Sequence, residues 1–210
     1  MLGGILCALP GPDSIDELQA GDGLIRQPSL VDRVPAVLAA YGLRCVVVHL
    51  DKPPRNDARR LKKLLGRVLP ESAIIWDDEK IRAYRVPDEP DRRGVVVGMG
   101  LEWGPIEGDH RCAAEAANVV LLLLDRSARE VLLRGSAFSY REPGEIDVAF
   151  NGRPRTTLRL TSSPQPLAFP LILQPGYNVI RLETRGLFSE RADGRQRGLA
   201  LGALRVDGED

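Results

Sequence analysis

From about residue 94 onward the sequence is a succession of short segments with β-strand character. These segments are rich in β-branched and large apolar residues, recur mostly at intervals of about 8–12 residues, and are separated by turn residues. They comprise residues 95–97, 118–124, 130–133, 146–150, 156–160, 167–173, 179–184 and 199–206. Clear helical spacing is absent from this part of the sequence. The rhythm predicts an antiparallel, jelly-roll-like β-sandwich over residues 95–207.

Two dipeptides mark tight turns within the predicted sandwich. Asn151-Gly152 lies between two of the strand segments and provides residue types that tolerate the positive φ angles of a two-residue hairpin. Pro175-Gly176 precedes the strand that begins near Val179 and marks a second turn. Both turns favour strands that run antiparallel to their neighbours in sequence.

Residues 1–90 follow a different pattern and predict a small α/β lobe. Apolar residues at helical spacing run from Leu30 to Tyr41, and Gly42 follows at the position of a helix C-cap. Residues 43–50 read as a strand buried on both faces, and residues 56–68 as a second helix. Residues 73–76 and 81–86 read as a hairpin with an acidic turn. The charged segment 88–94 is the expected boundary, so the fold class is α+β in two parts.

The charge balance disfavours nucleic acid and anionic membrane surfaces as partners. Lys and Arg total 29 and Asp and Glu total 29, so the net charge at neutral pH is zero. A chain without a net positive field is a poor ligand for polyanions, and we expect no nucleic-acid partner. No apolar stretch approaches the roughly 20 residues of a membrane-spanning helix, so we expect no transmembrane segment in this chain.

The sequence predicts no catalytic residues, no metal and no cofactor. Cys7, Cys45 and Cys112 are far apart and form no Cys-x-x-Cys pair, so neither a zinc site nor a disulfide framework can be inferred from them. His49 with Asp51 at a strand end, and His110 in a turn, are interpreted as structural polar groups. No Gly-x-Ser-x-Gly elbow is present, and the sequence has no motif for the paired carboxylates of a glycan hydrolase.

One group of residues has the chemistry of a sugar-binding site. Such sites combine an aromatic face with planar carboxylate and guanidinium groups that form pairs of hydrogen bonds to hydroxyls. The segment EWGPIEGDHR and the later segment ERADGRQRG supply these types, and the candidate ligand-binding residues are Trp103, Glu107, Arg111, Asp193 and Arg195. The alternative is structural: Trp103 covers the edge of the core and Arg111 or Arg195 pairs with Glu107.

Six stretches of the sequence together resemble a known family. They are YGLRCVVVHLD (41–51), IIWDDEKIRAYRVP (74–87), WGPIEGDHR (103–111), IDVAFNG (146–152), LQPGYNVIRLET (173–184) and DGRQRGLALGALRV (193–206). In order and spacing they resemble the C-terminal extracytoplasmic region of bacterial integral-membrane glycosyltransferases that use polyprenyl-phosphate sugars and are similar in plan to protein mannosyltransferases. The family tends to carry a tryptophan where this chain has Cys112.

The resemblance implies a carbohydrate-binding-module-like sandwich on the outer side of a bacterial membrane, without the catalytic membrane part. The chain is then either a separate accessory piece or a truncated gene product, and no enzyme activity is expected of it alone. The implied function is a non-catalytic accessory domain of cell-envelope glycosyl transfer that contacts a glycan or a lipid-linked sugar. The alternative is a protein–protein interaction domain that docks on a membrane glycosyltransferase without binding sugar. This alternative predicts an exposed apolar patch.

Overall fold

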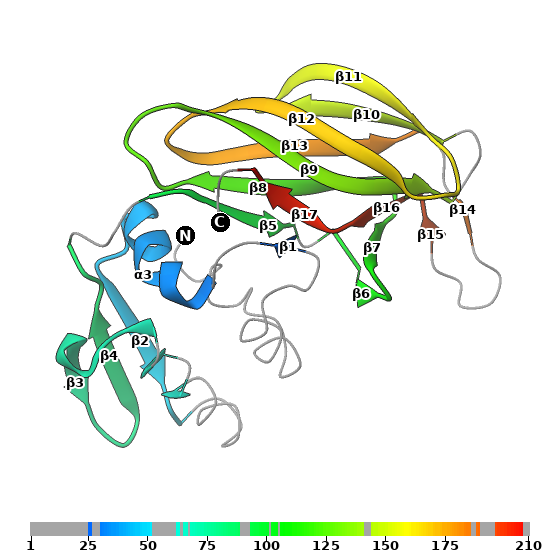
Figure 1. The fold of residues 1–210 in the computed structure, drawn as a ribbon. Helices are drawn as coiled ribbons and strands as arrows, with labels where there is room; N and C mark the ends of the chain where they lie inside the picture. The colour runs from blue at the N-terminus through cyan, green and yellow to red at the C-terminus, as the bar shows by residue number, and fades with distance from the viewer. Residues whose placement is uncertain are drawn as a thin grey trace. The chain divides into compact units, whose positions relative to one another are not determined.

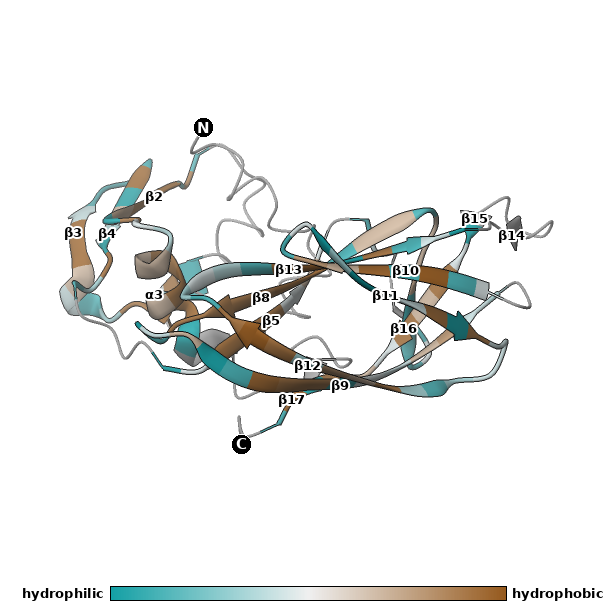
Figure 2. Cartoon of the chain, turned by 90° about the horizontal axis from the view of Figure 1, so that it is seen from above, coloured by the Kyte–Doolittle hydropathy of each residue, from teal (hydrophilic) through white to brown (hydrophobic). Residues whose placement is uncertain are grey.

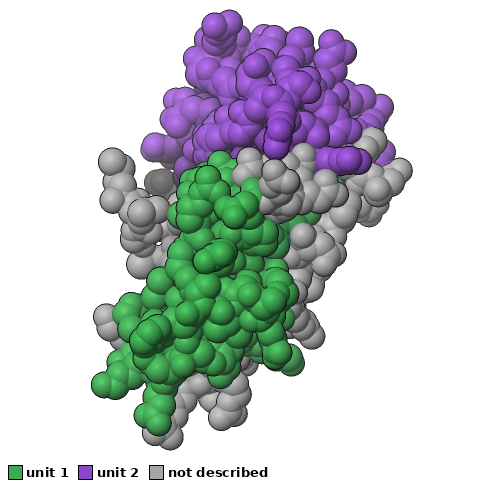
Figure 3. Space-filling model, turned by 90° about the vertical axis from the view of Figure 1, so that its left-hand side faces the viewer, with its two compact units in different colours: residues 1–22, 29–92 green, residues 23–28, 93–210 purple. Residues whose placement is uncertain are grey.

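The computed structural model describes residues 25–26, 30–51, 62–63, 65–66, 68–88, 93–100, 102–104, 106–140, 144–185, 188–189 and 196–207. The chain divides into two compact units, which are coloured separately in Figure 3. Unit 1 comprises residues 1–22 and 29–92, and unit 2 comprises residues 23–28 and 93–210. Residues 29–92 of unit 1 are thus inserted between the two segments of unit 2. No helix among the described residues is long and apolar enough to cross a membrane.

Unit 1 contains a helix and a three-stranded antiparallel sheet. The helix is α3 (Leu30–Ala40), and the sheet has the order β2 (Cys45–His49), β4 (Ile81–Arg85), β3 (Ile74–Asp77), with a short 3-10 helix at Glu71–Ala73 before β3. The predicted hairpin is confirmed, since β3 pairs with β4. Helical residues are also described at 62–63, 65–66 and 68, within the predicted second helix.

The end of α3 is fixed by Gly42, as the sequence predicts. Its φ of +71° lies in the left-handed region, which glycine enters at little cost. The Gly42 amide donates to the Ala39 carbonyl at 2.9 Å, and the Leu43 amide donates to the Leu38 carbonyl at 3.0 Å. This pair of hydrogen bonds is a Schellman motif, and it satisfies two carbonyls at the end of the helix.

The prediction that residues 43–50 form a strand buried on both faces is wrong. Burial alternates along β2: Val46 and Val48 are buried, whereas Cys45, Val47 and His49 are exposed. The buried face packs in a cluster that includes Leu69, Tyr84 and Val86. The other face of this strand is open, so a β-branched run here reflects strand propensity and not two-sided burial.

Unit 2 is a sandwich of two mainly antiparallel sheets (Figure 1). One sheet has the order β1-β17-β9-β16-β7-β6, with β12 paired to the opposite edge of β9. Its strands are β1 (Ile25–Arg26), β6 (Ile106–Glu107), β7 (His110–Ala113), β9 (Arg129–Ser139), β12 (Gln165–Leu173), β16 (Leu199–Gly202) and β17 (Leu204–Val206). The described exception to the antiparallel arrangement is β1, which runs parallel to β17.

The second sheet of the sandwich has five strands in the order β11-β10-β13-β8-β5. Its strands are β5 (Val95–Met99), β8 (Ala116–Leu123), β10 (Gly144–Phe150), β11 (Arg153–Leu160) and β13 (Gly176–Thr184). A separate two-stranded ribbon joins β14 (Phe188–Ser189) to β15 (Gln196–Arg197). The predicted antiparallel β-sandwich is therefore present.

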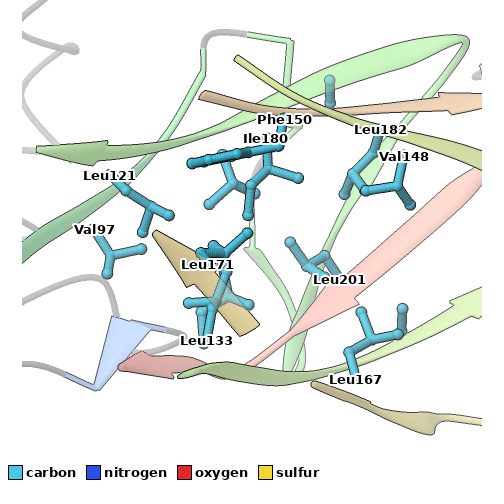
Figure 4. Packing of buried hydrophobic residues seen from close by; sticks show 14 of the residues in the cluster. Val97, Leu121, Leu133, Val148, Phe150, Leu167, Leu171, Ile180, Leu182 and Leu201 are labelled. Atoms are coloured by element: carbon cyan, nitrogen blue, oxygen red, sulfur yellow. The ribbon is translucent and has the colours of Figure 1, made fainter. Parts of the chain in front are cut away.

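The core of unit 2 lies between its two sheets. Inward-facing residues of both sheets meet there, including Leu121, Ile180 and Phe150 from one sheet and Leu133, Leu171 and Leu201 from the other (Figure 4). Figure 2 shows the hydrophobic segments of β5, β8 and β10 that contribute to this layer. Burial of alternate residues, as along β10, matches the period of two that a half-buried strand requires.

The Asn151-Gly152 dipeptide forms the turn between β10 and β11. Both residues have positive φ, +48° and +76°, and Phe150 pairs with Arg153 across the two-residue loop. These angles are those of a type I′ turn, whose twist matches the strands on either side. The sequence prediction of a tight hairpin at this point is confirmed.

Candidate functional site

A polar cluster lies on the outer face of the larger sheet, where β7 and β9 flank β16. Ala200 pairs with Cys112 on one side and with Phe138 on the other, and Gly202 pairs with His110. Because the middle strand carries only small residues on this face, longer side chains from β7 and β9 meet above it. The His110 and Phe138 rings are in edge contact, with centroids 4.9 Å apart.

The β6–β7 hairpin adds the carboxylate of Glu107 to the polar cluster on this face of the sheet. Glu107 pairs with His110 across the two-residue loop Gly108-Asp109, and Gly108 has a φ of +70°. Residues paired across a ladder point to the same face, so Glu107 and His110 lie together. Cys112 lies two residues after His110 and shares that face. We call Glu107, His110, Cys112, Tyr140 and Arg197 the hairpin cluster.

Hydrogen bonds connect every member of the hairpin cluster. The Tyr140 hydroxyl lies 3.1 Å from His110 Nε2 and 3.0 Å from Cys112 Sγ. The Cys112 thiol lies 3.8 Å from Glu107 Oε2. Arg197 Nη2 donates to both carboxylate oxygens of Glu107 at 3.2 and 3.3 Å. The Arg197 guanidinium also lies over the Tyr140 ring, 5.8 Å from its centroid.

The cluster is partly open to solvent. The Arg197 side chain is 8% exposed, whereas that of Glu107 is 30% exposed. The His110 side chain is 20% exposed, and its Nδ1–H donates a hydrogen bond to Asp109 Oδ1 at 3.1 Å. A buried guanidinium therefore holds a carboxylate whose remaining surface faces water, which leaves acceptor capacity for a polar ligand.

Burial controls the ionisation of the two weak acids in the cluster. Burial raises the pKa of the Cys112 thiol, against a smaller opposing effect of its hydrogen bond with Tyr140. Burial likewise raises the pKa of the Tyr140 phenol, and the contact with Cys112 adds to this effect. The hydrogen bond with His110 lowers the pKa of Asp109. A buried, protonated thiol is a poor nucleophile, so this geometry does not activate Cys112 for covalent chemistry.

Trp103 and Arg111, two of the ligand-binding residues proposed from the sequence, lie away from the hairpin cluster. Trp103 is 6% exposed, belongs to the sandwich core and donates from Nε1 to the Asn118 carbonyl at 2.8 Å. Its ring therefore presents no open face to a sugar. Arg111 pairs with Ile106, on the opposite face of the hairpin from Glu107, and its Nη1 donates to the Gly104 carbonyl at 3.1 Å.

Asp193 and Arg195 lie outside the described residues. Of the three proposed residues that the structure describes, Glu107 is the one that lies in the hairpin cluster. Glu107 forms an ion pair with Arg197, a residue that the structural alternative did not name. The two segments from which the candidates were drawn, EWGPIEGDHR and ERADGRQRG, nevertheless meet at the ion pair between Glu107 and Arg197.

Sequence reasoning missed Cys112, Tyr140 and Arg197. The signal for Cys112 was the alternation of Glu107, His110 and Cys112 across a Gly-Asp turn, which places all three on one face of a hairpin. No comparable signal exists for Tyr140 and Arg197, because they reach the cluster through long-range pairing of β9 and β16 with β7. Their proximity depends on the order of strands in the sheet.

Unit 1 also carries an exposed tryptophan that was not among the residues proposed from the sequence. Trp76 is 60% exposed, and its Nε1 donates to Asp78 Oδ2 at 2.8 Å. This hydrogen bond limits rotation of the indole and leaves ring surface in contact with water. A fixed, open aromatic face of this kind is suited to packing against the C–H groups of a sugar ring.

Unit 2 also contains a pocket of about 280 Å³, which is mainly apolar, in contrast to the polar hairpin cluster. Its walls are mainly apolar and include Val148, Leu158, Phe169 and Leu171, with Arg155 at its lining. The Arg155 guanidinium lies 5.6 Å from the centroid of the Phe150 ring. With so few hydrogen-bonding groups, the pocket is less suited to a sugar than the hairpin cluster.

Comparisons with known proteins found no matching family model and no matching curated protein. Solved structures that resemble part of the chain include carbohydrate-binding modules. The CBM35 of Cellvibrio japonicus Abf62 has a TM-score of 0.37 and 17% identity, over 55% of this chain and 90% of that chain. The native family 35 module of Clostridium thermocellum has a TM-score of 0.36 and 10% identity, over 54% and 91%. A CBM36 in complex with calcium and xylotriose has a TM-score of 0.30 and 16% identity, over 54% and 90%.

Proposed function

We propose that this chain is a non-catalytic module that contacts a glycan through the hairpin cluster. The observation that carries the proposal is the Glu107 carboxylate, held by Arg197 at 3.2 and 3.3 Å while 30% of the Glu107 side chain remains open to solvent. A carboxylate fixed in this way can accept hydrogen bonds from neighbouring hydroxyls without first being ordered.

The groups around Glu107 extend the same chemistry. His110 and Tyr140 add hydrogen-bonding atoms, and Phe138 adds a partly exposed aromatic ring beside them. The groups form a shallow surface, so the affinity expected for a sugar is weak, with a Kd on the order of 1 mM. The protein would then position a glycan and leave its bonds intact.

The biological setting of the proposal comes from the sequence motifs. Their resemblance to the extracytoplasmic region of polyprenyl-phosphate-sugar-dependent glycosyltransferases supports a role beside a membrane glycosyltransferase, on the outer side of a bacterial membrane. The glycan would be either the acceptor or the sugar part of a lipid-linked donor. Glu107 lies in one of the motifs that carry this resemblance.

The proposal is tested by titrating the full chain with monosaccharides and short envelope glycans at millimolar concentration, using amide chemical shifts and calorimetry. We expect shifts centred on β6 and β7, and about a tenfold loss of affinity in Glu107→Gln, the loss typical of a hydrogen bond to a charged group. Glu145→Gln is the matched control, since Glu145 forms a comparable ion pair with Arg185 in the other sheet.

Two results would count against the proposal. One is the absence of binding to any glycan in the panel, and the other is equal loss of affinity in Glu107→Gln and Glu145→Gln. Trp76→Ala distinguishes between the two aromatic candidates, Trp76 and Phe138. A loss of glycan affinity confined to Trp76→Ala would mean that the glycan contacts unit 1 and not the hairpin cluster.

A second candidate function is docking on a membrane glycosyltransferase without sugar. The observation that favours it is the outer face of β12, where four successive outward positions are apolar and exposed: Pro166, Ala168, Pro170 and Ile172. Ile172 alone is 53% exposed. Charged substitution of Ile172 would then abolish recovery of the membrane enzyme in a pull-down, whereas Glu107→Gln would leave it unchanged.

A further inference from the structure

We propose that Glu107, His110 and Cys112 form a binding site for a divalent transition metal of the zinc class. Their donor atoms, a carboxylate oxygen, an imidazole nitrogen and a thiol sulfur, all lie within 4.8 Å of one another. All three side chains project from the same face of the β6–β7 hairpin, in the spacing Glu-x-x-His-x-Cys. Glu107 and His110 also belong to the proposed glycan contact, but the metal site goes beyond that proposal and is tested without a sugar.

The distances suit an ion of this size. Zinc binds sulfur at about 2.3 Å, nitrogen at about 2.0–2.1 Å and carboxylate oxygen at about 2.0–2.2 Å, so two ligands of a tetrahedral ion lie about 3.3–3.8 Å apart. The 3.8 Å between Cys112 Sγ and Glu107 Oε2 is at the upper end of that interval. Closing the widest pair requires a movement of about 1 Å, within reach of a rotation of the partly exposed Glu107 side chain.

The donor set selects the class of metal. A thiolate and an imidazole favour zinc and its neighbours among the transition metals, whereas calcium and magnesium require oxygen ligands throughout. Three protein ligands leave a fourth coordination position for water. Among the described residues, this trio is the one group in which His, Cys, Asp or Glu side chains gather in this way.

The surrounding groups orient the ligands. Asp109 Oδ1 lies 3.1 Å from His110 Nδ1, an interaction that favours the proton on Nδ1 and leaves the Nε2 lone pair directed into the cluster. Arg197 holds both carboxylate oxygens of Glu107. With a divalent ion bound, the positive charges of the ion and Arg197 equal the negative charges of Glu107, Asp109 and the Cys112 thiolate, so the site is neutral as a whole.

The Tyr140 hydroxyl contacts two of the atoms that would bind the metal ion, so the hydroxyl and the ion compete for them. The hydroxyl lies within hydrogen-bond distance of both His110 Nε2 and Cys112 Sγ. We infer that the hydroxyl links these two ligands in the metal-free protein and that the metal replaces the link to Nε2. Removal of the hydroxyl in Tyr140→Phe should therefore leave metal affinity unchanged or increase it.

The test uses the full reduced chain titrated with Co²⁺ and then Zn²⁺. We expect one equivalent of Co²⁺ to produce thiolate-to-cobalt charge-transfer absorption, which Zn²⁺ abolishes by displacement. In Cys112→Ser this absorption should be lost and zinc affinity should fall at least tenfold, and Asp109→Asn should weaken zinc binding by about tenfold. Cys45→Ser is the matched control, since Cys45 is an exposed thiol in unit 1.

Several results would overturn the site. They are the absence of charge-transfer absorption in the wild type, its persistence in Cys112→Ser, and its loss in Cys45→Ser. If Cys112→Ser does not fold, X-ray absorption of the wild-type zinc complex decides. One sulfur and at least one imidazole nitrogen in the coordination shell support the site, and a shell of oxygen and nitrogen alone rejects it.

Discussion

At the scale of single residues, the hairpin cluster depends on the small residues Ala200 and Gly202 on the outer face of β16, and on Gly198 just before the strand. Gly198 precedes the strand, and its amide donates to the Ala113 carbonyl at 2.8 Å while its carbonyl accepts from Ser139 Oγ at 3.2 Å. A Cβ at this position would press against the Ala114 carbonyl oxygen and lie 2.5 Å from Thr184 Cγ2. Glycine is therefore favoured here by close packing, because the Ala114 backbone oxygen and the Thr184 side chain leave no room for a Cβ.

We predict that Gly198→Ala destabilises the protein by about 1–3 kcal/mol, the cost of overpacking a site bounded by the Ala114 carbonyl and the Thr184 side chain. Urea denaturation followed by far-ultraviolet circular dichroism measures the change. Gly98→Ala is the control, because Gly98 lies in β5 with nothing within 4 Å of its added Cβ. Equal stability of the two variants would mean that the backbone around Gly198 relaxes freely.

At the scale of elements, β12 is an edge strand of the sandwich. Among the described strands it pairs with β9 alone. Pro166 and Pro170 lie four residues apart and therefore have their nitrogens on the same side of the strand. Since proline cannot donate a hydrogen bond, these residues are compatible with an edge strand and weaken its pairing with another chain.

We expect the double substitution Pro166→Thr with Pro170→Thr to promote association between chains. Threonine restores two amide donors at the free edge and has high strand propensity. Light scattering after size-exclusion chromatography should show a mass that rises with concentration in the double variant. Ala168→Thr controls for the threonine side chain on the same face, and association of this control to the same extent would rule out the role of the prolines.

At the scale of the whole molecule, the sequence predicts architecture better than it predicts the site. Each strand segment expected after residue 94 lies in the sandwich, although residues 199–206 form two strands, β16 and β17, and not one. These segments could be predicted because alternating apolar residues and turn residues are local signals. The short hairpin around Gly108 was missed, since its few residues are mainly charged or small and show no clear apolar alternation. The partners of Glu107 could not be predicted either, because Arg197 is 90 residues away and reaches it only through strand order.

The two hydrophobic clusters predict separate unfolding of the two units. The cluster of unit 1 includes Leu69 and Tyr84, and that of unit 2 includes Leu121 and Trp103. Each unit contains one of the two tryptophans of the chain, Trp76 in unit 1 and Trp103 in unit 2. Single-tryptophan variants, Trp76→Phe and Trp103→Phe, therefore report on one unit each by fluorescence during urea denaturation.

Leu121→Ala provides the decisive perturbation, because Leu121 is fully buried in the core of unit 2. The lost side chain and the cavity it leaves should cost about 2–5 kcal/mol. We expect the midpoint reported by Trp103 to fall while the midpoint reported by Trp76 stays within error of its original value. A parallel fall at both tryptophans would mean that the chain unfolds as one cooperative structure, and the expected boundary near residues 88–94 would then separate two parts of a single folding unit.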